Sequence, residues 1–467
     1  MSTDPEFVYI AIFLAAYYFF IILYLWLVVV RILRWVSLLQ QKEYRWDRMQ
    51  AFIGSRVGLQ ELARVINLAL RKVNVRRPRF TKKASLIILG SLVMVLVLAN
   101  VSVMWALIGY MIIPVVVGLV VLPINVITYG VQVFLERKAK ALFDKARPVV
   151  IGITGSYGKT TTKILITELL KSKHNVGMSP KSYNTPLSLP MAMVKSYKGE
   201  EIMVLEFAAY KKGEIARMSG LFPPQMAVIT GIAPQHVGLF GSIENIVEAK
   251  SELLVALPKG AKVFFNNSDK RVVEMVSRFK SLKKIAVDAI KPAYKSRLFG
   301  SLYTANVNLA SAVASDFGLS TGLIEKGFND FKPTTEFVRI IKLKNDIRLI
   351  DDGGTSNPRG FATILREVAK MKGKKMVVSA GIVDLGKESE DIHRKLAKKI
   401  NETTDWFVHT SDLEATVLRQ KLGYKYIRVN TADELRIMLK KLTKGDLLLI
   451  EGKLRADLQV VFNELIN

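Results

Sequence analysis

The stretch 149-VVIGITGSYGKTTT-162 decides how this chain is organised. A short apolar run rich in β-branched residues enters a glycine-rich turn, and Lys159-Thr160 opens an amphipathic segment that continues to Leu170. This order predicts a strand, a phosphate-binding loop and a helix N-terminus. The glycines let backbone N–H groups approach phosphate oxygens, Lys159 adds a positive charge, and the Thr160 hydroxyl can reach Mg²⁺.

The composition limits the classes of protein to which the chain can belong. Its 467 residues leave room for two or three domains, and a hydrophobic content of 50% is high for a soluble protein. The absence of cysteine excludes disulfides, thiolate catalysis and zinc–thiolate sites. A formal net charge of +28 is compatible with nucleic acid or with an anionic membrane surface, so the position of the charge must decide.

The N-terminal part is predicted to be a membrane module of about three helices. Residues 7–30 carry no charge and exceed the roughly 20 residues that cross a bilayer. Residues 84–132 form a second uncharged run that breaks near residues 99–102, which predicts a tight helical hairpin. The second helix of that hairpin would contain Pro114 and Pro123, as membrane helices often tolerate.

Basic residues gather between these runs and predict the topology. Only Glu43, Asp47 and Glu61 oppose the cations of residues 31–83, which are Arg31, Arg34, Lys42, Arg45, Arg48, Arg56, Arg64, Arg71, Lys72, Arg76, Arg77, Arg79, Lys82 and Lys83. The positive-inside rule places this loop, and the phosphate loop after it, on the cytoplasmic side of a multi-pass inner-membrane protein. Lipid headgroups explain the charge better than nucleic acid does, and a groove for an anionic lipid-linked substrate is an open alternative.

A second set of segments predicts a parallel α/β domain around the phosphate loop. Residues 202–206 read as a buried strand that ends in Glu206, and residues 226–230 read as another strand followed by a loop to His236. A helix over residues 243–257 contains Lys250. Ligands of parallel sheets bind at the carboxyl ends of strands, so Glu206, the loop after residue 230 and the phosphate loop should converge there. Glu206 suits a Mg²⁺ ligand and equally a capping or salt-bridged glutamate.

Several motifs in sequence order resemble the Mur ligases, the amide-forming enzymes of peptidoglycan precursor synthesis. The loop Thr154–Thr161 resembles their ATP loop, and Ser182–Leu187 resembles the asparagine-containing loop that follows it. Further matches point to the branch that adds D-alanyl-D-alanine, namely Leu205-Glu206 with Gly213-Glu214-Ile215, Pro234-Gln235-His236 with Phe240-Gly241-Ser242, Glu248 to Glu252, and Leu385 to Ser389 with His393.

The resemblance implies roles for individual residues. Lys159, His236 and Lys250 would be catalytic, with Lys250 carried as a carbamate because an ammonium group cannot bind a cation. One Mg²⁺ would be held by Thr160 and Glu206, and a second by His236 and Lys250. ATP would be bound by Gly155, Ser156, Tyr157, Gly158, Lys159, Thr160, Thr161, Asn308, Arg339, Asp351 and Asp352, with Asn308 near the adenine.

From residue 333 the composition changes, and the alternation of segments predicts a Rossmann-like C-terminal domain. Strands alternate with helices in a right-handed parallel arrangement. No G-x-G-x-x-G fingerprint occurs, so no dinucleotide is inferred. The predicted strands are Ile347–Asp352, Met376–Ala380, Trp406–His409, Tyr426–Val429 and Leu447–Ile450. The expected domains are therefore a transmembrane module over residues 1–140, an ATP-binding domain over 141–332 and a ligase domain over 333–467.

The resemblance predicts a membrane-anchored, ATP-dependent amide ligase that forms an acyl phosphate and releases ADP. The domain with which relatives bind a UDP-sugar is replaced by the membrane module. The carboxylate acceptor can therefore be UDP-linked or lipid-linked. The usual Lys-Gly-Ser-Arg near the end is replaced by Glu451-Gly452-Lys453-Leu454, which leaves the incoming amino acid or dipeptide open. The alternatives are an ATP-binding membrane scaffold without ligase activity and a polyglutamate-type ligase.

Overall fold

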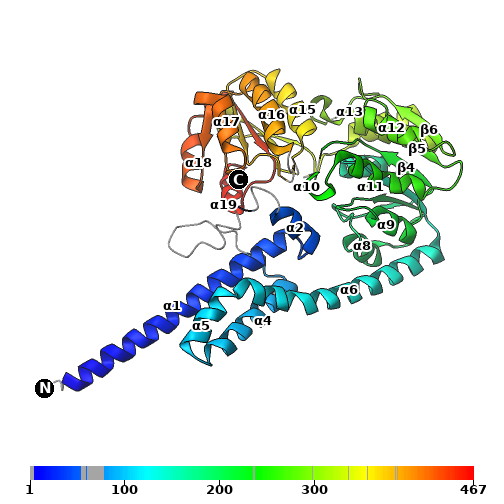
Figure 1. Cartoon of the computed structure of the whole chain (residues 1–467). Coiled ribbons are helices and arrows are strands. Elements are labelled where there is room, and N and C mark those ends of the chain that lie inside the picture. The colour runs from blue at the N-terminus through cyan, green and yellow to red at the C-terminus, as the bar shows by residue number, and fades with distance from the viewer. Residues whose placement is uncertain are drawn as a thin grey trace. The chain divides into compact units, whose positions relative to one another are not determined.

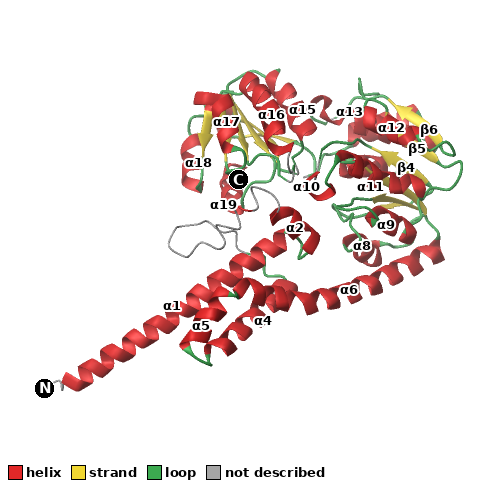
Figure 2. Cartoon of the chain, in the orientation of Figure 1, coloured by secondary structure: helices red, strands yellow, loops and turns green. Residues whose placement is uncertain are grey.

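The computed structural model describes residues 5–53, 59, 78–234, 237–296, 298–334, 336–354, 356–383, 385 and 388–466. The chain divides into two compact units, which we call the helical unit (Met1–Val133) and the α/β unit (Phe134–Asn467). Figure 1 shows the course of the chain, and Figure 2 shows that all described strands belong to the α/β unit.

The helical unit is built on long apolar helices. Its described helices are α1 (Pro5–Gln41), α2 (Trp46–Ile53), α4 (Lys82–Ala99), α5 (Val103–Met111) and the first part of α6 (Ile113–Ala146). By length and composition, α1 from Val8, α4 and α6 can each cross a membrane. A small core joins Val28, Ile32 and Val36 of α1 to residues of α4 and α6.

The predicted hairpin break is confirmed, but its second helix differs from the prediction. Asn100 caps the end of α4, and the Ser102 hydroxyl accepts from the backbone N–H of Trp105 to start α5. A separate helix, α6, then begins with Pro114 in its first turn, where the N–H that proline lacks would have no partner. Pro123 lies inside α6 as expected. Residues 54–58 and 60–77 of the predicted basic loop lie outside the described residues.

The first half of the α/β unit, the middle domain, is a parallel sheet in the order β2-β3-β1-β4-β5-β6. Its elements are β1 (Val149–Thr154), α7 (Lys159–Leu170), β2 (Val176–Met178), α8 (Ser188–Ser196), β3 (Ile202–Glu206), α9 (Glu214–Leu221), β4 (Met226–Ile229), α10 (Val237–Phe240), α11 (Ile243–Val255), β5 (Lys262–Asn266), α12 (Lys270–Ser277), β6 (Lys283–Val287), η1 (Gly300–Tyr303), α13 (Thr304–Asp316) and α14 (Thr321–Asp330).

The register of this sheet brings the predicted site residues to one edge. Ile153 of β1 pairs with Glu206 of β3, and Thr154 pairs with Ile229 of β4. The strands therefore end at the same level, directly before the phosphate loop and the loop after β4. Near the end of α6, just before β1, the Phe143 ring packs 4.7 Å from that of Phe222 and 4.9 Å from that of Tyr197, measured between ring centroids.

The second half of the α/β unit, the C-terminal domain, has a sheet in the order β11-β10-β9-β12-β8-β7. Its elements are β7 (Arg339–Lys342), η2 (Lys344–Asp346), β8 (Arg348–Asp352), α15 (Pro358–Ala369), β9 (Lys375–Ser379), α16 (Ser389–Thr403), β10 (Trp406–His409), α17 (Ala415–Leu422), η4 (Gly423–Lys425), β11 (Tyr426–Arg428), α18 (Ala432–Leu439), β12 (Leu447–Glu451) and α19 (Ala456–Ile466). The predicted two-domain α/β fold is confirmed. The prediction omitted α17 and β7, and β7 pairs with β8 in the antiparallel direction.

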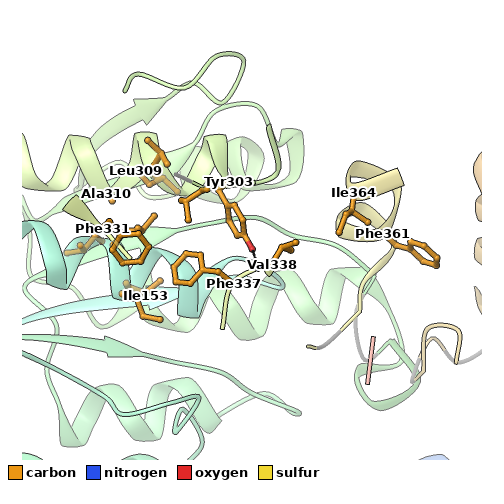
Figure 3. Packing of buried hydrophobic residues seen from close by; sticks show 14 of the residues in the cluster. Ile153, Tyr303, Leu309, Ala310, Phe331, Phe337, Val338, Phe361 and Ile364 are labelled. Carbon is orange, nitrogen blue, oxygen red and sulfur yellow. Dashed lines mark hydrogen bonds between the residues drawn. The ribbon is translucent and has the colours of Figure 1, made fainter. Parts of the chain in front are cut away.

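An aromatic cluster joins the two halves of the α/β unit where the chain passes between them. The Phe337 ring lies 5.2 Å from that of Phe331 and 5.4 Å from that of Tyr303 (Figure 3). The backbone N–H of Val338 donates to the Tyr303 hydroxyl at 2.7 Å. The segment between the domains is thus held by buried rings and one hydrogen bond to the middle domain.

A candidate nucleotide and metal site at the phosphate loop

The phosphate loop follows β1 and requires glycine at two positions. Gly155 has φ +154° and Gly158, the residue before α7, has φ +75°, both in the region that side chains disfavour. A Cβ atom on Gly155 would lie 2.1 Å from Thr230 Oγ1, and one on Gly158 would lie 2.6 Å from Asn306 Nδ2. The loop is therefore closely packed against the residues that follow β4 and against α13, and neither glycine position has room for a side chain.

Two lysines meet at this loop. The Nζ atoms of Lys159 and Lys250 donate to the same carbonyl oxygen, that of Gly155, at 2.8 and 2.9 Å. Burial lowers the pKa of both amines, and the charge of Lys159 lowers the pKa of Lys250 further. Two amines this close repel each other when both are charged. The negative charge of a polyphosphate would therefore stabilise them in their charged form.

Glu206 stands at the centre of a hydrogen-bonded network beside the loop. The Thr160 hydroxyl donates to its Oε2 at 2.8 Å, and the Asn184 side-chain amide donates to its Oε1 at 2.6 Å. Lys163 Nζ lies 3.5 Å from the Glu206 carboxylate, and both side chains are at most 2% exposed. Glu206 is thus a salt-bridged carboxylate, one of the two expectations for this residue, and it also lies beside Thr160.

The sequence did not assign a role to Lys163 or Asn184. Lys163 also donates to the carbonyl oxygen of Lys181 and lies 3.5 Å from the Ser179 hydroxyl, which ties α7 to the loop after β2. The spacing of Lys163 could have indicated its place, because a residue four positions after Lys159 lies on the same face of the helix.

The chemistry of these donors fits Mg²⁺. Magnesium binds hard oxygen ligands, usually one or two from the protein together with phosphate oxygens and water. The Thr160 hydroxyl and the Glu206 carboxylate are such ligands and already touch. Within the described ranges no group of three or more His, Asp or Glu residues gathers. His236, predicted to bind a second ion, lies outside the described residues, as does Gln235.

The other loop residues contact the loop after β4 and Asp269, the residue before α12. Ser156 Oγ donates to the carbonyl oxygen of Ala233 at 3.1 Å, and Ser156 N–H donates to that of Gly231 at 2.6 Å. The Tyr157 hydroxyl donates to Asp269 Oδ2 at 3.0 Å. Thr161 lies in the first turn of α7.

The remaining predicted ATP-binding residues hold local structure. Asn308 uses its amide group on the backbone of residues 288–293, donating to Asp288 O at 2.7 Å and Lys291 O at 2.8 Å and accepting from Ala293 N–H at 2.7 Å. Arg339 of β7 forms an ion pair with Asp351 of β8.

The half-buried Asp352 forms an acidic pair with the buried Glu451, since the two residues are neighbours on β8 and β12. Burial raises the pKa of Asp352 to about 6 and raises that of Glu451 well above its usual value. Glu451 Oε1 accepts from the Ser356 hydroxyl. Glu451 stands where the resemblance expected lysine, so a buried acid with a raised pKa replaces a cation at this edge of the C-terminal sheet.

Comparison with known proteins assigns this fold to a family. The family model described as Mur ligase middle domain matches residues 153–314, and the model described as Mur ligase, glutamate ligase domain matches residues 337–454. The UDP-N-acetylmuramoyl-tripeptide–D-alanyl-D-alanine ligase of Bacillus subtilis (strain 168) is 27% identical over 360 residues, covering 71% of this chain and 79% of that protein. The enzyme of the same name from Synechocystis is 26% identical over 270 residues, covering 54% of this chain and 59% of that protein.

Solved structures share the fold. MurF from Acinetobacter baumannii has a TM-score of 0.64 at 23% identity, covering 72% of this chain and 80% of that one. MurF ligase from Thermotoga maritima in complex with ADP has a TM-score of 0.63 at 23% identity, covering 72% of this chain and 84% of that one. With both family models matched in order and the phosphate loop intact, the chain belongs to the Mur ligase family of ATP-dependent, ADP-forming amide ligases.

Proposed function

We propose that this chain is a membrane-anchored ligase that uses ATP to join an amine to a carboxyl group of a peptidoglycan precursor. The observation that carries the proposal is the Thr160–Glu206 contact beside a loop on which Lys159 and Lys250 converge. In this proposal residues 1–140 anchor the protein in the inner membrane, residues 141–332 bind ATP on the cytoplasmic side and residues 333–467 complete the ligase.

The residues of the loop position and activate the nucleotide. Gly155, Ser156, Tyr157, Gly158 and Thr161 line the backbone cradle, and Lys159 releases the Gly155 carbonyl to contact the β- and γ-phosphates. Thr160 and Glu206 would hold Mg²⁺, which neutralises charge on the phosphates when bound. Asn308, Arg339, Asp351 and Asp352 are proposed to bind the rest of ATP as the two domains close.

Lys250 is proposed to act after modification. Burial and the charge of Lys159 lower the pKa of Lys250, which favours the neutral amine, and a neutral amine can add to CO₂ and lose a proton to give a carbamate. The carbamate would supply oxygen ligands for a second Mg²⁺ together with His236. Mass spectrometry of intact protein under CO₂ and under CO₂-free buffer tests this step, since only the carbamate adds the mass of CO₂ at Lys250.

The proposed reaction has two steps, formation of an acyl phosphate and formation of an amide. A carboxylate oxygen of the acceptor attacks the γ-phosphorus, the bond to the β,γ-bridging oxygen breaks, and ADP leaves with an acyl phosphate formed. The amine nitrogen then attacks the acyl carbon, loses its proton, and expels inorganic phosphate. Catalysis rests on positioning and on positive charge around the phosphates.

The names of relatives suggest which substrates to test. The first two relatives are named for a UDP-N-acetylmuramoyl-tripeptide and D-alanyl-D-alanine, and these are the first pair to test. The apolar helices α1, α4 and α6 favour a second acceptor, the same peptide on a lipid carrier, which would reach the site from the bilayer. Turnover of soluble against lipid-linked acceptor in detergent separates the two, because activity on the soluble acceptor alone removes the lipid proposal.

Release of ADP by the purified protein tests the function. We expect ADP release that depends on both acceptor and amine, and a loss of at least about 100-fold in Lys159→Ala. Lys171→Ala is the matched control, since Lys171 follows the same helix but is exposed and pairs with Glu168. ATP binding without acceptor-dependent ADP release would favour the scaffold, and a ladder of glutamate-extended products would favour the polyglutamate ligase.

A further inference from the structure

One helix of the C-terminal domain contacts the middle domain along a single face. Arg359 and Glu367 are eight residues apart on α15, about two turns, and so lie on the same side of the helix. Glu367 Oε1 accepts from the Ser301 hydroxyl at 2.6 Å. At the N-terminal end of α15, Arg359 Nη1 donates to the Tyr157 hydroxyl and, at 3.2 Å, to Asp269 Oδ2. The phosphate loop is thereby bonded to the domain that follows it.

Asp269 is the point at which these bonds meet. Its Oδ2 accepts from the Tyr157 hydroxyl and from Ile232 N–H, both at 3.0 Å. Its Oδ1 caps α12 by accepting from the N–H groups of Arg271 and Val272. The Asp269 side chain is only 5% exposed, so a displacement of the carboxylate would disturb the phosphate loop, the loop after β4 and α12 together.

Tyr157 has little room to move. A Cβ atom on Gly231 would lie 2.2 Å from both Cζ and the hydroxyl oxygen of Tyr157, so the ring lies directly on that glycine. The Thr230 hydroxyl donates to the Tyr157 carbonyl oxygen. Burial raises the pKa of the Tyr157 hydroxyl, which therefore stays protonated and able to donate. The Arg359 guanidinium lies 5.2 Å from the ring centroid, within reach of a cation–π interaction.

Arg359 is itself held at a defined place. Asn357 caps α15 by accepting from Gly360 N–H at 2.9 Å, and Pro358 occupies the first helical position. Arg359 follows directly, at the end of the segment that runs on from Asp351 and Asp352. The position of this segment and that of the phosphate loop are therefore linked through one side chain.

We infer that Arg359 is a positioning residue that couples the placement of the C-terminal domain to the phosphate loop through Tyr157 and Asp269. The coupling goes beyond the proposed function, although its kinetic consequences rest on that function. Without Arg359 the loop still has its glycines and lysines, so ATP still binds. The C-terminal segment is no longer held over the loop, so the step from bound ATP to acyl phosphate slows.

A double-mutant cycle tests the inference by kinetics. We expect Arg359→Ala to lower kcat by about 10- to 100-fold, since small misplacements of reacting groups cost that much, while KM for ATP changes less than about threefold. Arg359→Lys should recover part of the loss. Tyr157→Phe keeps the ring but removes the hydroxyl, and the double variant should be little worse than Arg359→Ala alone because the two side chains act as a unit.

Arg366→Ala is the matched control. Arg366 lies on the same helix, is exposed and donates to Thr363 of its own helix, so its loss should leave kcat unchanged. The inference is overturned if Arg359→Ala behaves like Arg366→Ala, or if the effects of Tyr157→Phe and Arg359→Ala simply add.

Hydrogen–deuterium exchange provides a readout that needs no turnover. We expect Arg359→Ala, but not Arg366→Ala, to speed exchange both in the phosphate loop and in the first turn of α15. If the wild-type protein turns over no acceptor but this pattern is seen, the proposed function fails and the coupling stands. If exchange in the phosphate loop is the same in both variants, the coupling fails whatever the turnover.

Discussion

Replacing Glu206 with glutamine should both destabilise the fold and stop the reaction, for separable reasons. The ammonium of Lys163 lies 3.5 Å from the Glu206 carboxylate, and the two side chains are 1% and 2% exposed. Removing one partner of such a pair leaves a buried charge without compensation, which costs about 3–5 kcal/mol. For a domain of this size that loss corresponds to a fall in Tm of about 10 °C.

A second variant separates stability from chemistry. In Lys163→Met with Glu206→Gln the buried charges are both gone, so we expect most of the lost Tm to return. The neutral amide that takes the place of the Glu206 carboxylate is a poor ligand for Mg²⁺, so ADP release should stay at least about 100-fold below wild type in both variants.

Thermal unfolding followed by near-ultraviolet circular dichroism, together with ADP release, measures both effects. If Glu206→Gln alone leaves Tm unchanged, Lys163 and Glu206 do not form a buried ion pair. If the double variant regains ligase activity together with its stability, Glu206 serves the fold and not the metal, and the proposed site is refuted.

Two further perturbations test the C-terminal acidic pair and the phosphate loop. Burial raises the pKa of Asp352 from 3.8 to about 6, so its stabilising contribution is complete below about pH 4 and is lost as pH rises through 6. Between about pH 4 and 7 the wild-type unfolding free energy should therefore fall by up to about 3 kcal/mol more than that of Asp352→Asn, and parallel curves in urea titrations would contradict this. Gly158→Ala should weaken ATP binding at least about tenfold by calorimetry, because the new Cβ would meet Asn306 at 2.6 Å. Gly199 also has a positive φ but has open space around it, so Gly199→Ala should leave ATP binding unchanged. An equal loss of ATP binding in both variants would show that backbone strain, and not the contact with Asn306, is the cause.

The parts of the molecule that the sequence predicted are those specified by neighbouring residues. The phosphate loop is recognisable because β1, the glycines and Lys159 follow one another directly. The strands that end in Glu206 and Asp352 were found for the same reason, since a short apolar run stops at a polar residue. These local patterns were sufficient for the two-domain α/β fold.

The parts that were missed depend on residues far apart in the chain. Lys163 reads as an ordinary helical lysine until the sheet register brings Glu206 beside it. Arg359 and Tyr157 are 202 positions apart, and no periodicity links them. The strand β7 was missed because its four residues, Arg339–Lys342, begin and end with a cation and contain only two apolar residues. The break between α5 and α6 was missed because Pro114 was read as tolerated within a helix and not as the beginning of one.

The transfer of oxygen from acceptor to phosphate tests the central claim most directly. The claim is that ATP at the phosphate loop phosphorylates a carboxyl group before an amine attacks it. With UDP-N-acetylmuramoyl-tripeptide labelled with ¹⁸O in its carboxyl group, ATP and D-alanyl-D-alanine, mass spectrometry should find one ¹⁸O in each inorganic phosphate released. A lipid-linked acceptor labelled in the same way should be measured in parallel. Phosphate that acquires its oxygen only from water, with either acceptor, would contradict the account.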